Sequence, residues 1–148
     1  MHAEPRNEPI TIQLAKLLND TGRLAETYFY DGQLDTAIRV FDANAYLLDM
    51  AETRTQDALE FLLHYGKLAA QQGRHTRIGF VKALEIAQQA MTLAEASGDN
   101  AAIAAALDLT GLVHYYEALD ADRADFSAAN DCFQRALQLI EMASQVPA

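Results

Sequence analysis

Residues 35–49 read DTAIRVFDANAYLLD, and the same pattern returns at 81–95 as VKALEIAQQAMTLAE and at 127–141 as SAANDCFQRALQLIE. Successive copies are 46 residues apart, and apolar positions within the first copy step by three and four residues. This spacing places them on one stripe of an α-helix, so we expect one helix to be used three times. The matching residues are Ala37, Ala83 and Ala129, then Val40, Ile86 and Cys132, then Leu47, Leu93 and Leu139.

A second series of residues marks another helix in each repeat. A leucine stands four residues before a glycine in three pairs, which are Leu18 and Gly22, Leu62 and Gly66, and Leu107 and Gly111. Leucines around these glycines keep the spacing of a helix. Each repeat is therefore predicted to be a helix pair. First helices are expected near 10–29, 55–72 and 99–118, and second helices near 34–52, 77–97 and 125–145.

Turn residues separate the expected helices. Asp31-Gly32 and Gly73 are predicted to end first helices, and Ser97-Gly98-Asp99 to end a second one. The three prolines lie near the chain ends, and no stretch alternates β-branched and polar residues over a strand's length. We expect a single all-α domain over residues 1–148 with six main helices. Its repeats are expected near 10–52, 55–97 and 99–145, after a flexible tail over 1–8.

The glycines inside the first helices need a structural reason, because glycine costs about 1 kcal/mol relative to alanine within a helix. We predict close helix approach at these three positions, with the alanines of the second helices as the facing residues. A free hinge at each glycine is the alternative.

The charge of the chain disfavours two classes of partner. The formal net charge is −10 and the isoelectric point is near 4.6, so phosphate backbones and anionic lipid surfaces are repelled. The one cysteine, Cys132, cannot form an internal disulfide, and the first residues lack the pattern of a secretion signal. We therefore expect a cytoplasmic protein with no nucleic-acid or membrane partner.

Second-helix positions follow a further pattern, in which an alanine is followed by an aromatic residue and then by another small residue. The pattern is carried by Ala37 and Phe41, by Ala129, Phe133 and Ala136, and, without the aromatic residue, by Ala83 and Ala90. These residues, together with the junction at 93–107, make residues 10–143 resemble tetratricopeptide repeats of the longer-repeat branch. The resemblance implies a right-handed superhelical stack of about three helix pairs. Its concave face, lined by first helices, would bind an extended peptide or a partner helix.

The sequence also departs from the family pattern. The copies are 44 to 46 residues apart rather than about 34. No tryptophan precedes the glycines, and Asn44 stands where a small residue is expected. Acids at Asp49, Glu95 and Glu141 replace the terminal proline. The missing prolines predict second helices that run one more turn.

By analogy with the family's groove, the first helices supply the expected binding residues. They are Lys16, Asn19, Arg23, Glu26, Glu60, Leu63, Lys67, Gln71, Asp108, Leu112, Tyr115 and Tyr116. Arg23 and Lys67 follow equivalent glycines and would meet a carboxylate or an acidic peptide, unless they pair with local acids such as Glu26. The two tyrosines offer amphipathic contact area. A chaperone-tail carboxylate clamp is disfavoured, because Asp108 and Leu112 stand where it needs basic residues.

No spacing predicts a catalytic, cofactor or metal site, and we expect no enzyme activity. His64 and His114 lie outside metal-ligand patterns. Asp120, Asp122 and Asp125 lack the glycine and the closing glutamate of a calcium loop. Capping of the last helix by Asp125 and a solvated turn explain these acids better.

One basic cluster interrupts the acidic chain, and it consists of Arg74, His75, Arg77 and Lys82. We interpret it as a solvated turn, with docking of a sulfate or phosphate as the alternative. Cys132 aligns with two aliphatic residues of the other copies and is expected to pack rather than to react.

Three functions fit these patterns. The first is a protein-interaction scaffold that uses the concave groove. The second is a self-assembling module, a homodimer or larger homo-oligomer, formed through the terminal helix. That helix carries Phe133, Leu137, Leu139, Ile140 and Met142 without an evident capping helix after it. The third is a regulatory domain that changes shape when it binds a peptide or a small effector.

Overall fold

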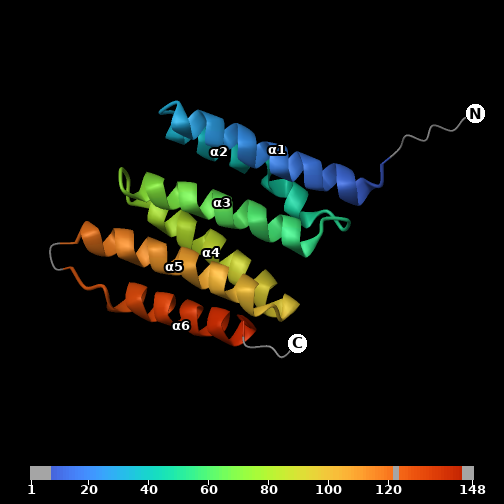
Figure 1. Cartoon of the computed structure of the whole chain (residues 1–148). Coiled ribbons are helices and arrows are strands. Elements are labelled where there is room, and N and C mark those ends of the chain that lie inside the picture. Colours follow the sequence, from blue (N-terminus) through green and yellow to red (C-terminus); the bar gives the residue numbers. More distant parts are fainter. Residues whose placement is uncertain (1–7, 122–123, 145–148) are drawn as a thin grey trace, which may run out of the picture. The chain divides into compact units, whose positions relative to one another are not determined.

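In the computed structural model, residues 8–121 and 124–144 are described, and over these ranges the regular secondary structure is all helical, with no strand (Figure 1). The α-helices are α1 (Ile10–Tyr30), α2 (Leu34–Asn44), α3 (Thr55–Gly73), α4 (Ile78–Ser97), α5 (Asn100–Leu119) and α6 (Ser127–Ser144), and a 3₁₀ helix, η1 (Ala45–Asp49), follows α2. The predicted all-α class with six main helices is confirmed. Of the expected tail, residues 1–7 lie outside the described ranges.

The helix boundaries agree with prediction except in the first repeat. The second helix expected over 34–52 ends at Asn44 and continues only as the 3₁₀ turn η1. The Asn44 side chain donates a hydrogen bond to the carbonyl of Val40 at 3.1 Å, and the Thr53 hydroxyl donates to the carbonyl of Leu47 at 2.6 Å. Side chains that bond the local backbone compete with the helical ladder, which explains the early end of α2.

Two predicted helix stops are confirmed by backbone conformation. Gly32 and Gly98 have φ angles of +80° and +70°, in the left-handed region that glycine enters without a steric penalty. Gly98 follows the last residue of α4. Asp99 then caps the start of α5, because its carboxylate accepts a hydrogen bond from the N–H of Ala101 at 3.0 Å. Only two residues, Gly98 and Asp99, therefore separate α4 from α5.

The chain divides into two compact units, with the boundary between Phe61 and Leu62 inside α3. The first unit contains α1, α2, η1 and the start of α3. Its core includes Leu14, Leu18 and Phe41, all buried, and the rings of Phe41 and Phe61 meet edge to face with centroids 5.1 Å apart.

The second unit contains the rest of α3 with α4, α5 and α6, and consecutive helices run antiparallel (Figure 1). The largest fully buried side chains of this unit are Leu62, Phe80, Leu109 and Val113. A further cluster joins α4, α5 and α6, and it consists of Ala104, Leu107 and Ala136 with Met91, Ile103 and Leu139 packed against them. Burial of apolar area of this kind is the main term that holds such a helix stack together.

Close helix approach at the interior glycines is confirmed for the second and third copies. A Cβ atom built on Gly66 would lie 2.5 Å from Leu109 Cδ2 and 3.3 Å from Ile86 Cγ2. A Cβ atom on Gly111 would lie 2.7 Å from Phe133 Cε1 and 3.1 Å from Cys132 Cβ. Both glycines are therefore contact points at which a side chain would collide with the neighbouring helix.

The residues that face these glycines differ from the predicted ones. Ala83 and Ala129 are buried, but neither is among the nearest contacts of the glycines. The nearest atoms belong to Leu109 at Gly66 and to Phe133 at Gly111, followed by Ile86 and Cys132, which lie three residues after the two alanines. Ile86 and Cys132 occupy the same register of the repeat. The second and third copies thus share one contact at this register, with a half-buried thiol in place of an isoleucine, whereas their nearest contacts, Leu109 and Phe133, differ.

Candidate functional site

The predicted binding residues of the first unit lie on exposed surface. Lys16, Asn19, Arg23 and Glu26 are exposed on α1, and Glu60 is exposed near the start of α3. Glu60 accepts a long hydrogen bond of 3.5 Å from Gln56. These residues are accessible to a partner.

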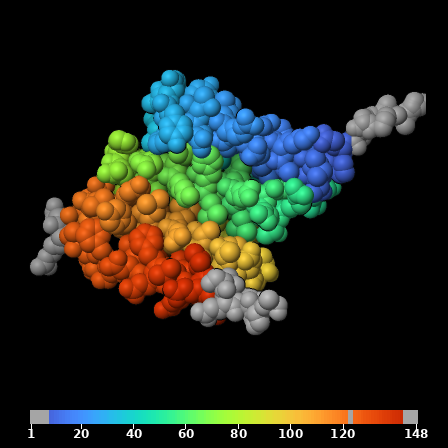
Figure 2. Space-filling view, in the orientation of Figure 1, coloured from blue at the N-terminus to red at the C-terminus, as the bar shows by residue number. Residues whose placement is uncertain are grey.

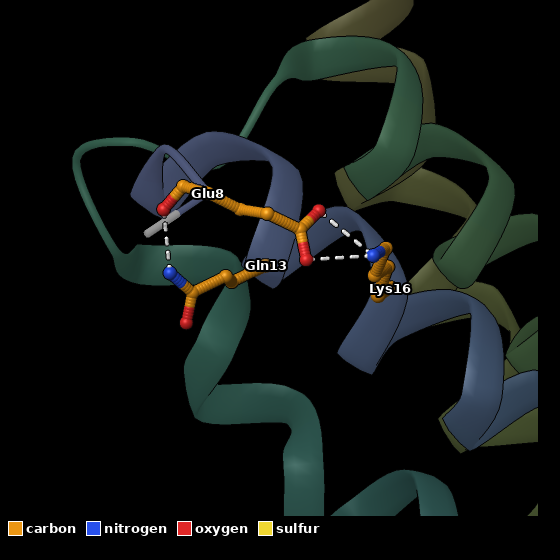
Figure 3. A network of polar contacts seen from close by, with 3 residues as sticks. All are labelled: Glu8, Gln13 and Lys16. Atoms are coloured by element: carbon orange, nitrogen blue, oxygen red, sulfur yellow. Dashed lines mark hydrogen bonds and ion pairs between the residues drawn. The ribbon is translucent and has the colours of Figure 1, made fainter. Parts of the chain in front are cut away.

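Lys16 forms an ion pair with Glu8, which lies two residues before the start of α1 (Figure 3). Its ammonium group lies 2.7 Å and 2.8 Å from the two carboxylate oxygens of Glu8, and the Gln13 amide donates to the Glu8 carbonyl at 2.6 Å. Both charged side chains are about half exposed or more, so this ion pair contributes little to stability. A ligand carboxylate at Lys16 would have to compete with Glu8.

In the second unit the structure gathers several predicted residues around Tyr116. The Gln71 amide on α3 donates a hydrogen bond to the Tyr116 hydroxyl on α5 at 3.0 Å. The guanidinium carbon of Arg74 lies 4.9 Å from the centroid of the Tyr116 ring, which is a cation–π contact. The Tyr115 ring lies 6.1 Å from that of Tyr116 and 5.4 Å from that of Phe126, just before α6. We call these five residues the Tyr116 cluster.

The Tyr116 cluster combines an exposed ring with a fixed one. Tyr115 is 40% exposed, whereas Tyr116 and Gln71 are half-buried. Figure 2 shows the surface of this region, where the yellow-green α3–α4 turn adjoins the orange end of α5. The cluster therefore lies at the surface, and its central ring, that of Tyr116, contacts both Gln71 and Arg74.

Lys67 on α3 and Asp108 on α5 influence each other electrostatically. Partial burial raises the pKa of the Asp108 carboxyl, and the nearby positive charge of Lys67 opposes that rise. Leu63 and Leu112, also predicted as groove residues, are half-buried on the same two helices.

The structure thus brings Gln71, Tyr115 and Tyr116 together, and the charge of Lys67 acts on the Asp108 carboxyl. Sequence reasoning did not connect Arg74 with the predicted groove and did not single out Phe126. Arg74 was recognised only as part of the basic cluster. Its contact with Tyr116 joins residues far apart in the chain, and a repeat pattern carries no signal for such a pair.

Asp125 and His114, two of the side chains considered above as metal ligands, contact neighbouring residues of their own segments. The Asp125 carboxylate accepts hydrogen bonds from the N–H of Ser127 at 3.0 Å and from its hydroxyl at 2.6 Å, which lowers the pKa of Asp125. The predicted role of Asp125 at the start of the last helix is confirmed, whereas Asp122 lies outside the described residues. His114 Nδ1 lies 3.3 Å from Glu117 Oε1. Over the described ranges, no three His, Cys, Asp or Glu side chains are grouped so as to hold a metal ion.

Cys132 is half-buried against Gly111 on α5. Burial raises the pKa of its thiol, the neighbouring Asp131 raises it further, and Arg135 opposes the rise. A thiol with a raised pKa is a poor nucleophile at neutral pH, in keeping with the predicted packing role.

The last described helix, α6, exposes three large apolar side chains. Leu137, Ile140 and Met142 are exposed, whereas Phe133 and Leu139 are half-buried toward α5. The expectation that the last helix leaves apolar residues uncovered is met by three of its five named residues.

Comparison with known proteins leaves the site to be interpreted from its own geometry. Neither family models, nor curated proteins, nor solved structures gave a match to this chain. Within the described part of the chain, none of the helices has the length and apolar character needed to cross a lipid bilayer.

Proposed function

We propose that this protein is a non-enzymatic interaction scaffold that binds a peptide or helix of a partner protein, and that the Tyr116 cluster is part of the binding face. The observation that carries the proposal is the arrangement of Tyr116 between the Gln71 amide and the Arg74 guanidinium on accessible surface. Tyrosine and arginine are enriched at protein interfaces, where they supply large contact area together with hydrogen-bonding groups.

The geometry favours binding because its central side chains are already ordered. Immobilising a flexible side chain costs about 0.5–1.5 kcal/mol on association. Tyr116 and Arg74 hold each other before a partner arrives, so this cost falls on folding instead. Tyr115, whose ring is more exposed, then offers an apolar surface beside a positive charge.

The proposal includes a tetratricopeptide-like stack of two-helix units and a cytoplasmic location. The repeat of one glycine contact, Gly66 against Ile86 and Gly111 against Cys132, supports the first part. The lone half-buried cysteine supports the second, since such thiols persist where the medium is reducing.

A pull-down from lysate with matched variants tests the proposal. Tyr115→Ala should abolish recovery of at least one partner, because it removes the exposed ring of the cluster. Tyr46→Ala, which removes an exposed tyrosine on η1, is the control and should leave recovery unchanged. Identical partner profiles for wild type and Tyr115→Ala would count against the cluster as a binding face.

Self-assembly through α6 is the second candidate function. It is favoured by three exposed apolar side chains of α6, which are Leu137, Ile140 and Met142. Leu137 and Ile140 lie three residues apart and therefore share a face of the helix. Light scattering should then show an oligomer that dissociates when Leu137 and Ile140 are both replaced by serine. A wild-type monomer at high protein concentration would eliminate this candidate.

A further inference from the structure

The charges of this acidic chain are unevenly distributed. No Asp or Glu occurs between Glu60 and Glu85, although the chain contains 21 such residues. The same stretch holds four of the 11 lysines and arginines, which are Lys67, Arg74, Arg77 and Lys82. A local positive charge therefore stands out within a chain whose formal net charge is −10.

Folding does not neutralise this charge at the α3–α4 turn. Arg74, His75 and Arg77 are exposed, and no carboxylate in the part of the chain that the structure describes forms an ion pair with them. The first turn of α4 also contains no acidic residue and has no side-chain cap, so the positive end of its helix dipole adds to the field.

Two aliphatic side chains lie next to these cations. Ile78 is 78% exposed and Val81 is 60% exposed, and they lie three residues apart on the first turns of α4. This spacing places them on one face of the helix, directly after Arg77. Cations and uncovered aliphatic groups thus follow one another within a short stretch of exposed chain.

The backbone beneath this surface is tightly packed. A Cβ atom on Gly79 would lie 2.8 Å from the carbonyl oxygen of Ala69 on α3, and one on Gly73 would lie 2.5 Å from Cε1 of the buried Phe80 ring. Arg74 is positioned by its contact with Tyr116. The surface is therefore held in place before binding, which lowers the entropy cost of association.

We propose that the basic turn surface, defined by Arg74, Arg77, Ile78 and Val81, binds a partner segment that carries both carboxylates and aliphatic side chains. Arginine binds carboxylates through paired hydrogen bonds, and aliphatic side chains of the segment would cover Ile78 and Val81. A nucleic acid fits less well, because it offers regularly spaced charge without aliphatic groups and would meet the acidic remainder of the chain. This inference rests on the proposed scaffold function and names the chemistry of the partner.

Selection from a random peptide display library on the immobilised full chain tests the inference. The enriched peptides should contain both acidic and aliphatic residues. Their affinity, measured by fluorescence polarisation, should fall about tenfold or more with Arg77→Glu and should also fall with Val81→Ser. It should weaken as salt rises from about 50 to about 300 mM. The control Arg39→Glu makes the same charge change at an exposed site on α2 and should have little effect.

The outcomes show whether this inference fails alone or together with the proposed scaffold function. Enriched peptides without acids that lose binding with Tyr115→Ala but not with Arg77→Glu would overturn this inference and leave the scaffold function standing. Failure to enrich any peptide would count against both. Binding of single-stranded RNA or anionic vesicles that is lost with Arg77→Glu, without peptide binding, would also overturn the inference. Circular dichroism of each variant checks that loss of binding is not loss of fold.

Discussion

The side-chain amide of Gln71 donates a hydrogen bond to the hydroxyl of Tyr116 at 3.0 Å, and this bond joins α3 to α5 across 45 residues of chain. Both side chains are half-buried, so neither can exchange this partner freely for water. The bond orients the ring over which the Arg74 guanidinium stacks, and it links the stability of the second unit to the proposed binding face.

A double-mutant cycle of Gln71→Ala and Tyr116→Phe measures this bond. Each change alone should lower the free energy of unfolding, and the coupling between them should be about 0.5–1.5 kcal/mol. Urea unfolding of the four proteins gives the value. Strictly additive effects would mean that the two side chains do not interact in solution.

Replacement of Gly66 by leucine should destabilise the protein although leucine is the better helix former. The new side chain would enter space held by Leu109 and Ile86, and overpacking of this kind costs about 1–3 kcal/mol. Gln89→Leu, at an exposed position of α4, is the matched control and should change stability little. A higher melting temperature for Gly66→Leu would show that this glycine is not a contact point.

Replacement of Gly79 by alanine should destabilise the fold unusually strongly, because α3 and α4 lie close together at this glycine. The added methyl group would meet backbone atoms of Ala69 and Gln72, which cannot move aside as a side chain can, so we expect a loss of about 2 kcal/mol. Gly98→Ala is the comparison, because it has open space and only its positive φ opposes the change, at about 1 kcal/mol. Thermal unfolding that ranked Gly98→Ala as the more damaging change would contradict the close crossing.

The two perturbed aspartates should respond to acid in opposite ways. Hydrogen bonds from Ser127 lower the folded pKa of Asp125, so its contribution to stability is present above the unfolded pKa of about 3.9 and is lost as the pH falls through the folded value. The folded pKa of Asp108 is raised by burial, so ionisation of this carboxyl opposes folding as the pH rises. Carboxyl resonances followed by NMR should titrate Asp125 before Asp108 as the pH is raised. The reverse order would contradict the hydrogen bonds to Ser127.

Much of the fold was predictable because its signals are local. The left-handed glycines Gly32 and Gly98 and the cap at Asp99 set helix ends through their nearest neighbours, and each was visible as a short motif. The early end of α2 was missed, because the helical periodicity continues through Asn44 while its side chain bonds the backbone instead. Periodicity indicates which face of a helix is apolar. It carries no information on whether a side chain such as that of Asn44 competes with the backbone for hydrogen bonds.

The candidate site was predictable only in part, for a related reason. Family analogy selected Gln71, Tyr115 and Tyr116 as accessible first-helix residues, but the contact of Arg74 with the Tyr116 ring depends on how α3 and α5 pack. The glycine contacts show the same limit. Close approach followed from the cost of glycine in a helix, whereas the identity of the contacting residues depends on how the neighbouring helices are rotated. These residues are Leu109 and Ile86 at Gly66, and Phe133 and Cys132 at Gly111.

The stacking of Arg74 on Tyr116 has a practical consequence in a chain that contains no tryptophan. Tyrosine emission can be recorded here without being masked by energy transfer to an indole. A bound partner segment that drew the Arg74 guanidinium away from the Tyr116 ring would change the surroundings of this tyrosine. Tyrosine fluorescence of the unlabelled protein can therefore report binding of the segment. The same spectrum, compared between wild type and Tyr116→Phe, would assign the signal to this one residue.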